Sequence, residues 1–390
     1  MIEPRLRFKT DDGSDFPDWE EKILGDVAEC LDNKRVPVNA EDRKKRVGTV
    51  PYYGAGGIQG YIDEYLFDEE LVLLLEDGDA FDDFQVKSIA QYITGKSWVN
   101  NHAHVLRAKD NAYFLFASLE HKDIRRWTQL AGASRKKLLK ESMLKITIMI
   151  PSLPEQQKIA DFLSTIDTII EKQQATVSAW EERKKGVMQK LFSQEVRFKA
   201  DDGSDFPDWE EKKIEELIQL YDEKVASGCE LPVLTSSKKN GIEYQEEHFA
   251  GKQRHDIDGY NVLPRNYCTY RNRSDGTDFT FNINRLCDKG IVSKFYPVFK
   301  ENNCDLFFLV SLLNNEPQAV RKIAYTAKGT GQKVLSIIDL KSIMIMMPSL
   351  PEQQKIADCL SALDTVIQKQ KETLEKWQEL KKGLLQQMFV

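Results

Sequence analysis

Four short motifs in this sequence have residue types that could support catalysis or bind a metal, and each lacks the context that the chemistry needs. Ala90–Ser97 reads AQYITGKS, which differs from a phosphate-binding loop by an alanine in place of the first glycine. Such a loop must open a helix, because the amides of the first helical turn hold the phosphates. The following residues, Trp98–His102, predict a continuing strand, so we do not expect a nucleotide site.

The remaining three motifs also point to structure rather than to catalysis. His102 and His104 could share a metal, but no cysteine or acidic residue accompanies them at ligand spacing. Asp11–Asp15 lacks the glycine and the final glutamate of a calcium loop and predicts an Asx turn. Pro17–Lys22 resembles a nuclease signature, but its acidic residues lie too close together for separate strands. We therefore expect no catalytic residue and no metal ligand in this chain.

Three segments in the first half of the chain suit contact with DNA. Pro51–Gly57 combines aromatic side chains with a glycine-rich backbone that a ligand can approach closely. Lys96–His104 alternates polar side chains along a predicted strand, and its amides could read adenine edges. Gly132–Lys137 is a small basic loop suited to phosphates. An ordinary turn, a half-buried strand and a solvated loop would explain the same residues. The candidate contact residues are Tyr52, Tyr53, Gly54, Gly56, Lys96, Trp98, Asn100, Asn101, His102, His104, Ser134, Arg135, Lys136 and Lys137.

The second half has polar and basic loops at corresponding positions, without sequence identity to the first. They lie at Thr235–Gly241, Tyr270–Gly276 and Ala327–Lys333. The last of these precedes a long helix, as Gly132–Lys137 does in the first half. The candidate contact residues of the three loops are Ser236, Ser237, Lys238, Lys239, Arg271, Asn272, Arg273, Lys328, Thr330, Gln332 and Lys333.

The elements that must position these loops are written into the chain twice. Arg7–Lys22 recurs at Arg197–Lys212 with one change, Thr10 to Ala200, and Pro151–Asp161 recurs without change at Pro348–Asp358. The stretches between the repeats, about 23–150 and 213–347, show no obvious similarity to each other. Strands are predicted in the first at Leu71–Leu75 and Ser97–Leu106. A duplicated framework that holds two different variable parts indicates a scaffold with two different recognition domains.

Each second repeat predicts the start of a long helix. Ser152 with Glu155, like Ser349 with Glu352, has the spacing of a capping box, and a proline follows in the first turn. Steps of four and three then trace an apolar seam of ten positions in each copy, which is typical of a coiled coil. The seam residues are Ile159, Leu163, Ile166, Ile170, Gln173, Val177, Trp180, Lys184, Val187 and Leu191, and in the second copy Ile356, Leu360, Leu363, Ile367, Gln370, Leu374, Trp377, Lys381, Leu384 and Met388.

The two helices are predicted to run antiparallel. A helix over Leu153–Phe192 would be roughly 55–60 Å long. The second variable stretch follows the first helix at once and leads straight into the second helix, and a domain of this size, with a radius of gyration of about 15 Å, does not bridge the length of such a rod. The end of the first helix must therefore lie near the start of the second. The predicted fold class is α+β, with two globular domains joined by two long antiparallel coiled-coil helices in a tandem pseudo-two-fold repeat.

Composition limits the class of protein further. The chain has 390 residues, 41% apolar and 30% charged, which suits globular domains rather than a disordered chain. It has no run of about 18 apolar residues and no apolar core near its first residues, and its six cysteines are scattered, so we expect a cytoplasmic protein with reduced thiols. The net charge is −7, but the charge is uneven. Tyr61–Asp83 has ten acidic and no basic residues, whereas His121–Lys145 has eight basic residues against two acidic ones, so we expect local basic patches that could meet phosphates.

Over its whole length the chain resembles the specificity subunits of type I restriction–modification enzymes. The motif PSLPEQQKIAD at Pro151 and Pro348, each opening a long helix after a variable stretch, carries most of the resemblance. GASRKKL from Gly132 and the GxGQKxLS stretch from Gly329 resemble the segments that precede this helix in the family. PYYG from Pro51 and WVNNHAHVL from Trp98 are similar to further family segments.

The resemblance implies target recognition domains at 1–150 and 195–347, each reading half of a split DNA sequence, and spacer helices at 151–194 and 348–390. In the family the helices set the spacing and dock two methyltransferase subunits, to which restriction subunits are added. S-adenosylmethionine, ATP and Mg would belong to those partners, so this chain would need no cofactor. Residues expected at the helix–helix and partner contacts are Ile159, Leu163, Ile166, Ile170, Trp180, Ile356, Leu360, Leu363, Ile367 and Trp377.

Two other classes of function fit the residues less completely. The chain could be a coiled-coil adaptor whose end domains bind proteins or glycans, with solvated basic loops. It could also be an enzyme whose active site is assembled from residues that spacing does not reveal. Binding to duplex DNA separates the first alternative from DNA recognition, and activity of the purified chain alone would reveal the second.

Overall fold

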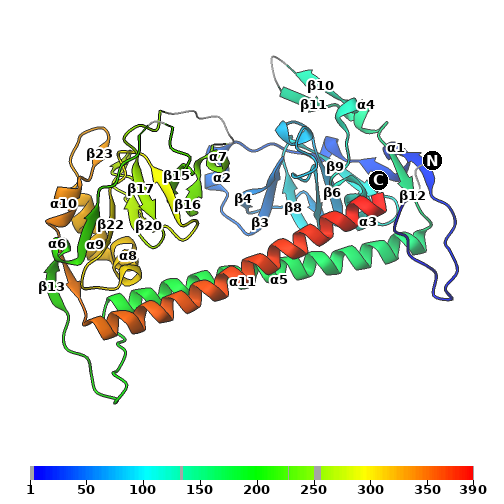
Figure 1. Cartoon of the computed structure of the whole chain (residues 1–390). Helices are drawn as coiled ribbons and strands as arrows, with labels where there is room; N and C mark the ends of the chain where they lie inside the picture. The colour runs from blue at the N-terminus through cyan, green and yellow to red at the C-terminus, as the bar shows by residue number, and fades with distance from the viewer. Residues whose placement is uncertain (1–3, 132–134, 227, 250–255, 390) are drawn as a thin grey trace. The chain divides into compact units, whose positions relative to one another are not determined.

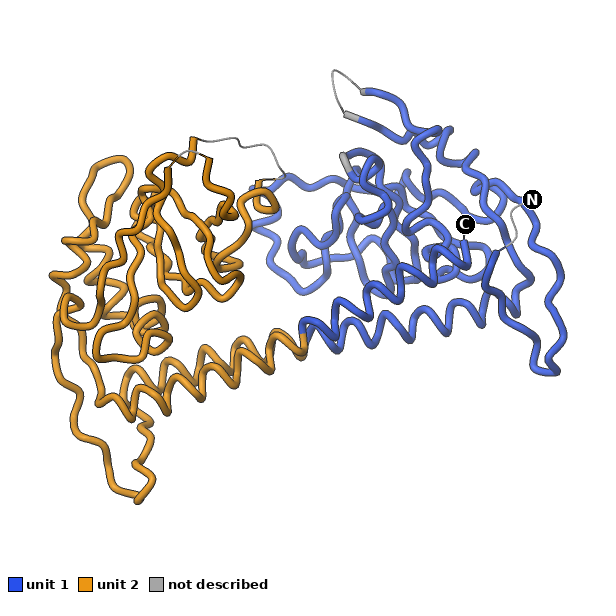
Figure 2. Tube along the Cα trace, in the orientation of Figure 1, with its two compact units in different colours: residues 1–175, 371–390 blue, residues 176–370 orange. Residues whose placement is uncertain are grey.

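The computed structural model divides into two compact units. It describes residues 4–131, 135–226, 228–249 and 256–389. Unit 1 comprises residues 1–175 and 371–390, and unit 2 comprises residues 176–370 (Figure 2). Each unit therefore contains one variable stretch together with parts of both repeats.

Unit 1 is built from twelve strands, four short helices and three 3-10 turns among its described residues, besides its share of two long helices (Figure 1). The strands are β1 (Glu20–Ile23), β2 (Ala28–Cys30), β3 (Val50–Gly54), β4 (Gly57–Ile62), β5 (Phe67–Asp68), β6 (Leu71–Leu75), β7 (Ala90–Ile93), β8 (Lys96–Val99), β9 (Ala103–Ala108), β10 (Thr128–Ala131), β11 (Arg135–Leu138) and β12 (Thr147–Ile150). The helices are α1 (Leu24–Val27), α2 (Ala40–Lys45), α3 (Ala112–Leu119) and α4 (Lys140–Met143), and the 3-10 turns are η1 (Asp32–Lys34), η2 (Asp79–Phe81) and η3 (Arg125–Trp127).

Two four-stranded sheets form the centre of unit 1. One has the order β2-β9-β6-β7 and is antiparallel throughout. The other has the order β4-β3-β8-β5, with β3 and β8 parallel. The five residues of β6 are all apolar and all buried, as expected for a strand whose sheet is covered on both faces. The strand predicted over Leu71–Leu75 is confirmed.

Unit 2 has its own sheets and helices. Its strands are β13 (Glu210–Lys213), β14 (Ile218–Tyr221), β15 (Leu234–Ser237), β16 (Gly241–Tyr244), β17 (Asn261–Pro264), β18 (Cys268–Tyr270), β19 (Arg273–Ser274), β20 (Phe281–Ile283), β21 (Lys289–Val292), β22 (Val298–Glu301), β23 (Lys333–Val334) and β24 (Met344–Met347). Its helices are α6 (Ile214–Leu217), α7 (Gln245–His248), α8 (Leu306–Asn315), α9 (Pro317–Thr326) and α10 (Ile337–Lys341). The largest sheet has the order β14-β22-β18-β20.

The two long helices are α5 (Leu153–Phe192) and α11 (Leu350–Phe389), which confirms the predicted extent of the first. In unit 1 the first part of α5 packs with the last part of α11, where Lys381 contacts Asp167 at 2.8 Å. In unit 2 the last part of α5 packs with the first part of α11, and the Lys184 ammonium lies 2.5 Å from Asp364. The helices are therefore antiparallel within each unit, as predicted (Figure 1).

The predicted seam matches the buried side of both helices. Each of its twenty positions is buried or half-buried. The polar seam positions Lys184 and Lys381 are the two lysines that form these cross-helix ion pairs. An ion pair thus fills one of the two polar interruptions of the heptad pattern in each copy.

The first repeat folds onto the start of the long helix in the same way in each unit. The Arg7 guanidinium donates to both carboxylate oxygens of Glu155, at 3.1 and 2.8 Å, and to the carbonyls of Phe16 and Pro17. Arg197 makes the matching bonds to Glu352, at 3.0 and 2.8 Å. Two parallel bonds of this kind are the strongest arrangement for an arginine and a carboxylate.

These arginines overturn the predicted capping boxes. The Glu155 carboxylate is buried and turned toward Arg7, and the indole of Trp19 also donates to it at 3.2 Å. The hydroxyl oxygens of Ser152 and Ser349 are buried without a hydrogen-bond partner in the described part of the chain. A charged donor from the first repeat competes more strongly for the glutamate than a neutral backbone amide does.

Each variable stretch begins and ends in one small sheet. Strand β1 pairs with β12 over Glu20↔Ile150 to Ile23↔Thr147, and β13 pairs with β24 over Glu210↔Met347 to Lys213↔Met344. The predicted Asx turn is also present, because the Ser14 amide donates to the Asp12 carboxylate at 3.1 Å. Among the described residues no helix is both long and apolar enough to cross a membrane.

Candidate nucleic-acid interface

The structure brings the predicted segments of the first variable stretch together. The turn between β3 and β4 lies beside the turn between β8 and β9. The backbone N–H of Asn100 donates to the backbone carbonyl of Tyr53 at 3.0 Å. His102 in the second turn contacts the Asp77 carboxylate at 3.2 Å, and Asp77 pairs with Lys137 of β11. We refer to these two turns and β11 as surface 1. The strand predicted over Ser97–Leu106 is broken at residues 100–102 by this turn.

Five of the predicted contact residues support surface 1 from below. Tyr52, Trp98, Asn100 and His104 are between 1% and 5% exposed, and Gly54 is also buried. The Tyr52 hydroxyl accepts from the amide of Val38 at 3.0 Å, and the Trp98 indole donates to the Val36 carbonyl at 2.7 Å. We therefore correct the prediction that these five touch DNA, since other atoms cover them.

The remaining predicted residues of this half lie at the surface or close to it. Lys96, Asn101 and Gly56 are exposed, and Tyr53, His102, Lys136 and Lys137 are partly exposed. Lys96 places its ammonium 4.8 Å from the centre of the Tyr65 ring. Ser134 and the side chain of Arg135 lie outside the described residues. The strand–turn–strand course of residues 90–99 excludes a phosphate-binding loop there, as the sequence predicted.

The basic charge of β11 is matched by acidic residues rather than separated from them. Lys137 contacts Glu76 at 3.1 Å, and Lys136 contacts Asp82. Both carboxylates come from the acidic stretch Tyr61–Asp83. The expectation of a segregated basic patch is therefore wrong for these two lysines, because the sheet brings the two stretches side by side.

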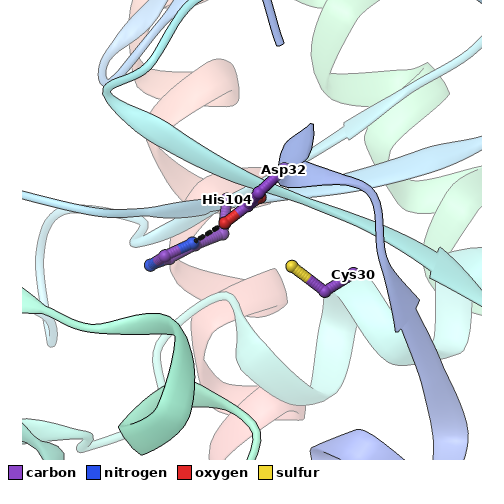
Figure 3. Close-up of side chains that lie close together, drawn as sticks. All are labelled: Cys30, Asp32 and His104. Atoms are coloured by element: carbon purple, nitrogen blue, oxygen red, sulfur yellow. Dashed lines mark hydrogen bonds and ion pairs between the residues drawn. The ribbon is translucent and has the colours of Figure 1, made fainter. Parts of the chain in front are cut away.

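Beneath β11, His104 belongs to a buried charged network (Figure 3). Its Nε2 donates to the Leu138 carbonyl at 2.8 Å, and its Nδ1 lies 2.6 Å from the Asp32 carboxylate. A carbonyl oxygen can only accept, so Nε2 is the donor to Leu138, and Nδ1 faces the Asp32 carboxylate. The network continues from Asp32 to Arg35 at 3.3 Å and from Arg35 to Glu76 at 2.6 Å.

The same place gathers three residue types that often bind metals. Cys30, Asp32 and His104 offer ligand atoms within 4.8 Å of one another, a proximity that sequence spacing does not reveal (Figure 3). The geometry suits an ion pair better than a metal. Two ligands on one zinc ion lie about 3.3 Å apart for bonds of about 2.0 Å, whereas Nδ1 and the carboxylate are 2.6 Å apart.

The electrostatics point the same way. Burial raises the pKa of the Cys30 thiol, which disfavours the thiolate that a metal needs. Burial would also raise the pKa of Asp32, but hydrogen bonding and the charge of His104, the Val105 amide and Arg35 together lower it. The group is therefore a salt bridge that fixes the base of β11.

In unit 2 the three predicted loops are also linked to one another. Lys238, in the turn between β15 and β16, contacts Asp278 at 2.7 Å in the loop after β19. Strand β19 pairs with β23 over Arg273↔Val334, and the Gln332 amide donates to Asp275 at 3.0 Å. We refer to this cluster as surface 2.

Most predicted residues of surface 2 are accessible. Lys238, Lys239, Arg271, Arg273, Lys328, Thr330 and Gln332 are exposed, and Ser236, Ser237, Asn272 and Lys333 are half-buried. Gly329 has a φ of +125°, and a Cβ there would lie 2.2 Å from the Gln332 carbonyl oxygen, so the turn requires glycine. Lys328 contacts Asp339 at 2.6 Å, and Arg273 stacks 4.3 Å from the centre of the Phe295 ring.

Two features beside surface 1 were not predicted from the sequence. Helix α2 and the residue after it carry the basic run RKKR, Arg43–Arg46, of which Arg43 and Arg46 stack on the rings of Tyr52 and Trp98 at 4.6 Å each. The basic run was a visible signal. Gln59 of β4 lies beside Arg43. The side-chain oxygen of Gln59 accepts from the Asn100 side chain at 3.3 Å and from Arg43 at 3.4 Å. No sequence pattern marks that glutamine.

The ten residues predicted at helix contacts all face the packed side of α5 or α11. Six are buried, namely Ile159, Leu163, Ile166, Ile356, Leu360 and Ile367, and Ile170, Trp180, Leu363 and Trp377 are half-buried. Their burial suits packing of the helices within each unit. The exposed apolar side chains Phe162 and Leu380 lie outside this set.

Comparison with known proteins gives the same architecture. Residues 17–178 and 207–376 each match the family model described as type I restriction modification DNA specificity domain. The two matches include most of the chain, so the chain belongs to this family of specificity proteins. One match falls on each repeat with its variable stretch.

Individual relatives agree with this assignment. The chain is 25% identical to the type I restriction enzyme MjaVIII specificity subunit of Methanocaldococcus jannaschii, over 92% of this chain and 90% of that protein. It is 37% identical to a protein of Haemophilus influenzae named as a type I restriction enzyme specificity subunit, over 38% of each chain. The fold is similar to the crystal structure of a type I system S subunit from M. genitalium, with a TM-score of 0.63, 12% identity and coverage of 100% and 99%.

Proposed function

We propose that this chain is the DNA-recognition subunit of a type I restriction–modification complex. Residues 1–150 and 195–347 would each read one half of a bipartite, asymmetric DNA sequence, through surface 1 and surface 2. One observation carries the proposal. The repeated residues make the same contacts in both family domains, as Arg7 with Glu155 and Arg197 with Glu352 do, whereas the two loop clusters that they support share no sequence.

The repeated helices, 151–194 and 348–390, would set the distance between the half-sites and dock two modification subunits. A partner present in two copies needs two like surfaces, and the repeats offer them. For example, Lys158 contacts Asp11 and Lys355 contacts Asp201 in the same way. Adenine methylation with S-adenosylmethionine, and cleavage that needs ATP and Mg, would belong to the partner subunits in the cytoplasm. This chain would be non-catalytic and free of cofactors.

Binding of the purified full-length chain to DNA tests the proposal. Duplexes with a randomised core are mixed with the chain at low and moderate salt, with and without a modification subunit from a related system, and the bound fraction is sequenced. The expected result is a motif of two specified blocks separated by an unspecified spacer. Binding should weaken as salt rises, because phosphate contacts release counterions.

Exchange of the first variable stretch, residues 23–150, for that of another family member gives the matched variant. The exchange should change one block of the motif and leave the other block and the spacer unchanged. Enrichment of no motif by the wild-type chain, with or without the partner, would contradict the proposal and favour a coiled-coil adaptor.

A further inference from the structure

The structure assigns to Gln59 the reading of one base in the half-site of the first domain, and the geometry points to guanine. This inference rests on the proposed function, and it names a contact that neither the repeats nor the loop composition indicates. Three features support it: a bulge in β4, the lack of a Cβ at Gly54, and two hydrogen bonds that hold the side-chain amide of Gln59.

The first observation is a break in the pairing of β3 with β4. Tyr52 pairs with Gly60, but the next residue, Tyr53, pairs with Ile58. Gln59 is therefore an extra residue without a partner on β3. Such bulges redirect a side chain and occur often beside functional sites.

The redirected side chain lies across the glycine turn. A Cβ built on Gly54 would lie 2.0 Å from the Gln59 side-chain nitrogen, so any other residue at position 54 would displace the amide. Gln59 itself is exposed, although its amide is held close to the backbone. The glycine thus provides the floor on which the amide rests.

Two donors fix which end of the Gln59 amide is left without a partner. The Asn100 oxygen accepts from the His102 amide at 2.9 Å, so the Asn100 nitrogen must be the atom that donates to Gln59, at 3.3 Å. Arg43 can only donate, and it contacts the same oxygen at 3.4 Å. The Gln59 oxygen is therefore engaged on the protein side, and its NH₂ group has no partner among the residues that the structure describes.

The exposed chemistry of the cluster consists of donors. The Gln59 NH₂ group and the unengaged N–H groups of Arg43 present donors only, and the Arg43 guanidinium is itself held 4.6 Å from the centre of the Tyr52 ring. In the major groove guanine shows two acceptors and thymine shows one beside a methyl group, whereas cytosine shows a donor and adenine shows one of each. Guanine is therefore the base that matches this surface best.

Asn100 takes a different role from the one predicted for it. It is 4% exposed. Its side-chain oxygen accepts from the His102 backbone amide, and its side-chain nitrogen donates to Gln59. It is a positioning residue, and Gln59 is the side chain that it positions.

The test replaces this donor by an acceptor. In Gln59→Glu the NH₂ group becomes a carboxylate oxygen, and Arg43 and Asn100 can still donate to the other oxygen. Motifs are selected from randomised duplexes with the full-length wild-type chain, Gln59→Glu, the shortened Gln59→Asn and the control Gln85→Glu. The control makes the same change at another exposed glutamine of unit 1.

One guanine in one block should be replaced by cytosine for Gln59→Glu, with a change in preference of about ten-fold, the lower end of the range for a base contact. Gln59→Asn should lose the preference at that position without inverting it, and Gln85→Glu should select the wild-type motif. Selection of the wild-type motif by both Gln59 variants would overturn this inference and leave the proposed function standing. A wild-type chain that selects no motif would overturn both.

Discussion

The two units use the same repeated residues, yet those residues meet different surroundings. In unit 1 the carboxylate of Glu155 accepts from Arg7 and from the Trp19 indole. In unit 2 Glu352 accepts from Arg197, but the Trp209 indole nitrogen is buried without a partner in the described part of the chain. The shared arginine–glutamate bond is thus common to both, and its support is not.

The cross-helix lysines show a larger difference. Lys381 in unit 1 lies between Asp167 and Glu120, the residue that follows α3, and the Lys381 side chain is 13% exposed. Lys184 in unit 2 pairs with Asp364, whose side chain is 45% exposed. The extra carboxylate comes from the variable stretch. A repeated residue therefore has a stability contribution that depends on the domain beside it.

The arginine–glutamate bonds are where the two units should be most alike. Arg7→Ala should lower the free energy of unfolding by about 3 kcal/mol and Arg197→Ala by about 4 kcal/mol, because each leaves a buried carboxylate without its cation. Arg197→Ala should cost about 1 kcal/mol more, since Glu352 lacks the tryptophan donor that Glu155 keeps. Urea unfolding of the full chain measures both.

Arg5→Ala is the control. It removes an exposed arginine two residues before Arg7 and should change the free energy of unfolding little. If all three variants unfold at the same urea concentration, the arginine–glutamate bonds do not stabilise the repeats.

The cross-helix lysines should separate the units. Lys381→Met should cost about 2 kcal/mol, because the buried Glu120 loses its cation and Asp167 loses one of its partners. Lys184→Met should cost about 0.5 kcal/mol, as expected for a pair that solvent reaches. Thermal unfolding of the two variants provides the measurement, and equal losses would show that α3 adds nothing to the helix contact.

A smaller effect than that of Lys381→Met concerns acid. The pKa of Asp32 lies below its ordinary 3.8 in the folded chain, since the bonds from His104, Val105 and Arg35 outweigh the effect of burial. The carboxylate therefore stabilises unit 1 above about pH 4, and this contribution is lost as the pH falls through the folded pKa. Asp32→Asn should cost about 1 kcal/mol at pH 7, because it removes the charged acceptor of the His104 and Val105 hydrogen bonds. The cost should shrink as the pH falls through the folded pKa of Asp32.

Glu243→Gln in unit 2 is the matched change, because Glu243 pairs with an exposed histidine, His248, at 3.2 Å. It should cost less at every pH. A pH-independent loss for Asp32→Asn would mean that the charge of Asp32 is not what holds the network together.

The sequence predicted the framework well because its signals are local or repeated. The heptad seam marks the packed side of α5 and α11 at every position, and the short connection to the second stretch required antiparallel helices. The capping boxes failed because Arg7 reaches Glu155 from 148 residues away. Spacing along one helix contains no information about such a competitor.

The candidate interface was predictable by segment and not by residue. Each set of loops gathers in one place, yet Tyr52, Trp98 and His104 turn inward to hold the layers beneath. Burial of that kind depends on which face of a sheet is covered, which residue types alone do not reveal. Gln59 was invisible for a related reason, since a bulge is set by the register of two strands and not by either strand alone.

The short sheets β1–β12 and β13–β24 have a consequence for how such a chain could change over time. Because each variable stretch enters and leaves through neighbouring strands, its whole interior can be replaced while the attachment points keep their hydrogen bonds. New specificities can then arise by exchange of complete variable stretches, while the repeated framework and its strand pairing stay the same.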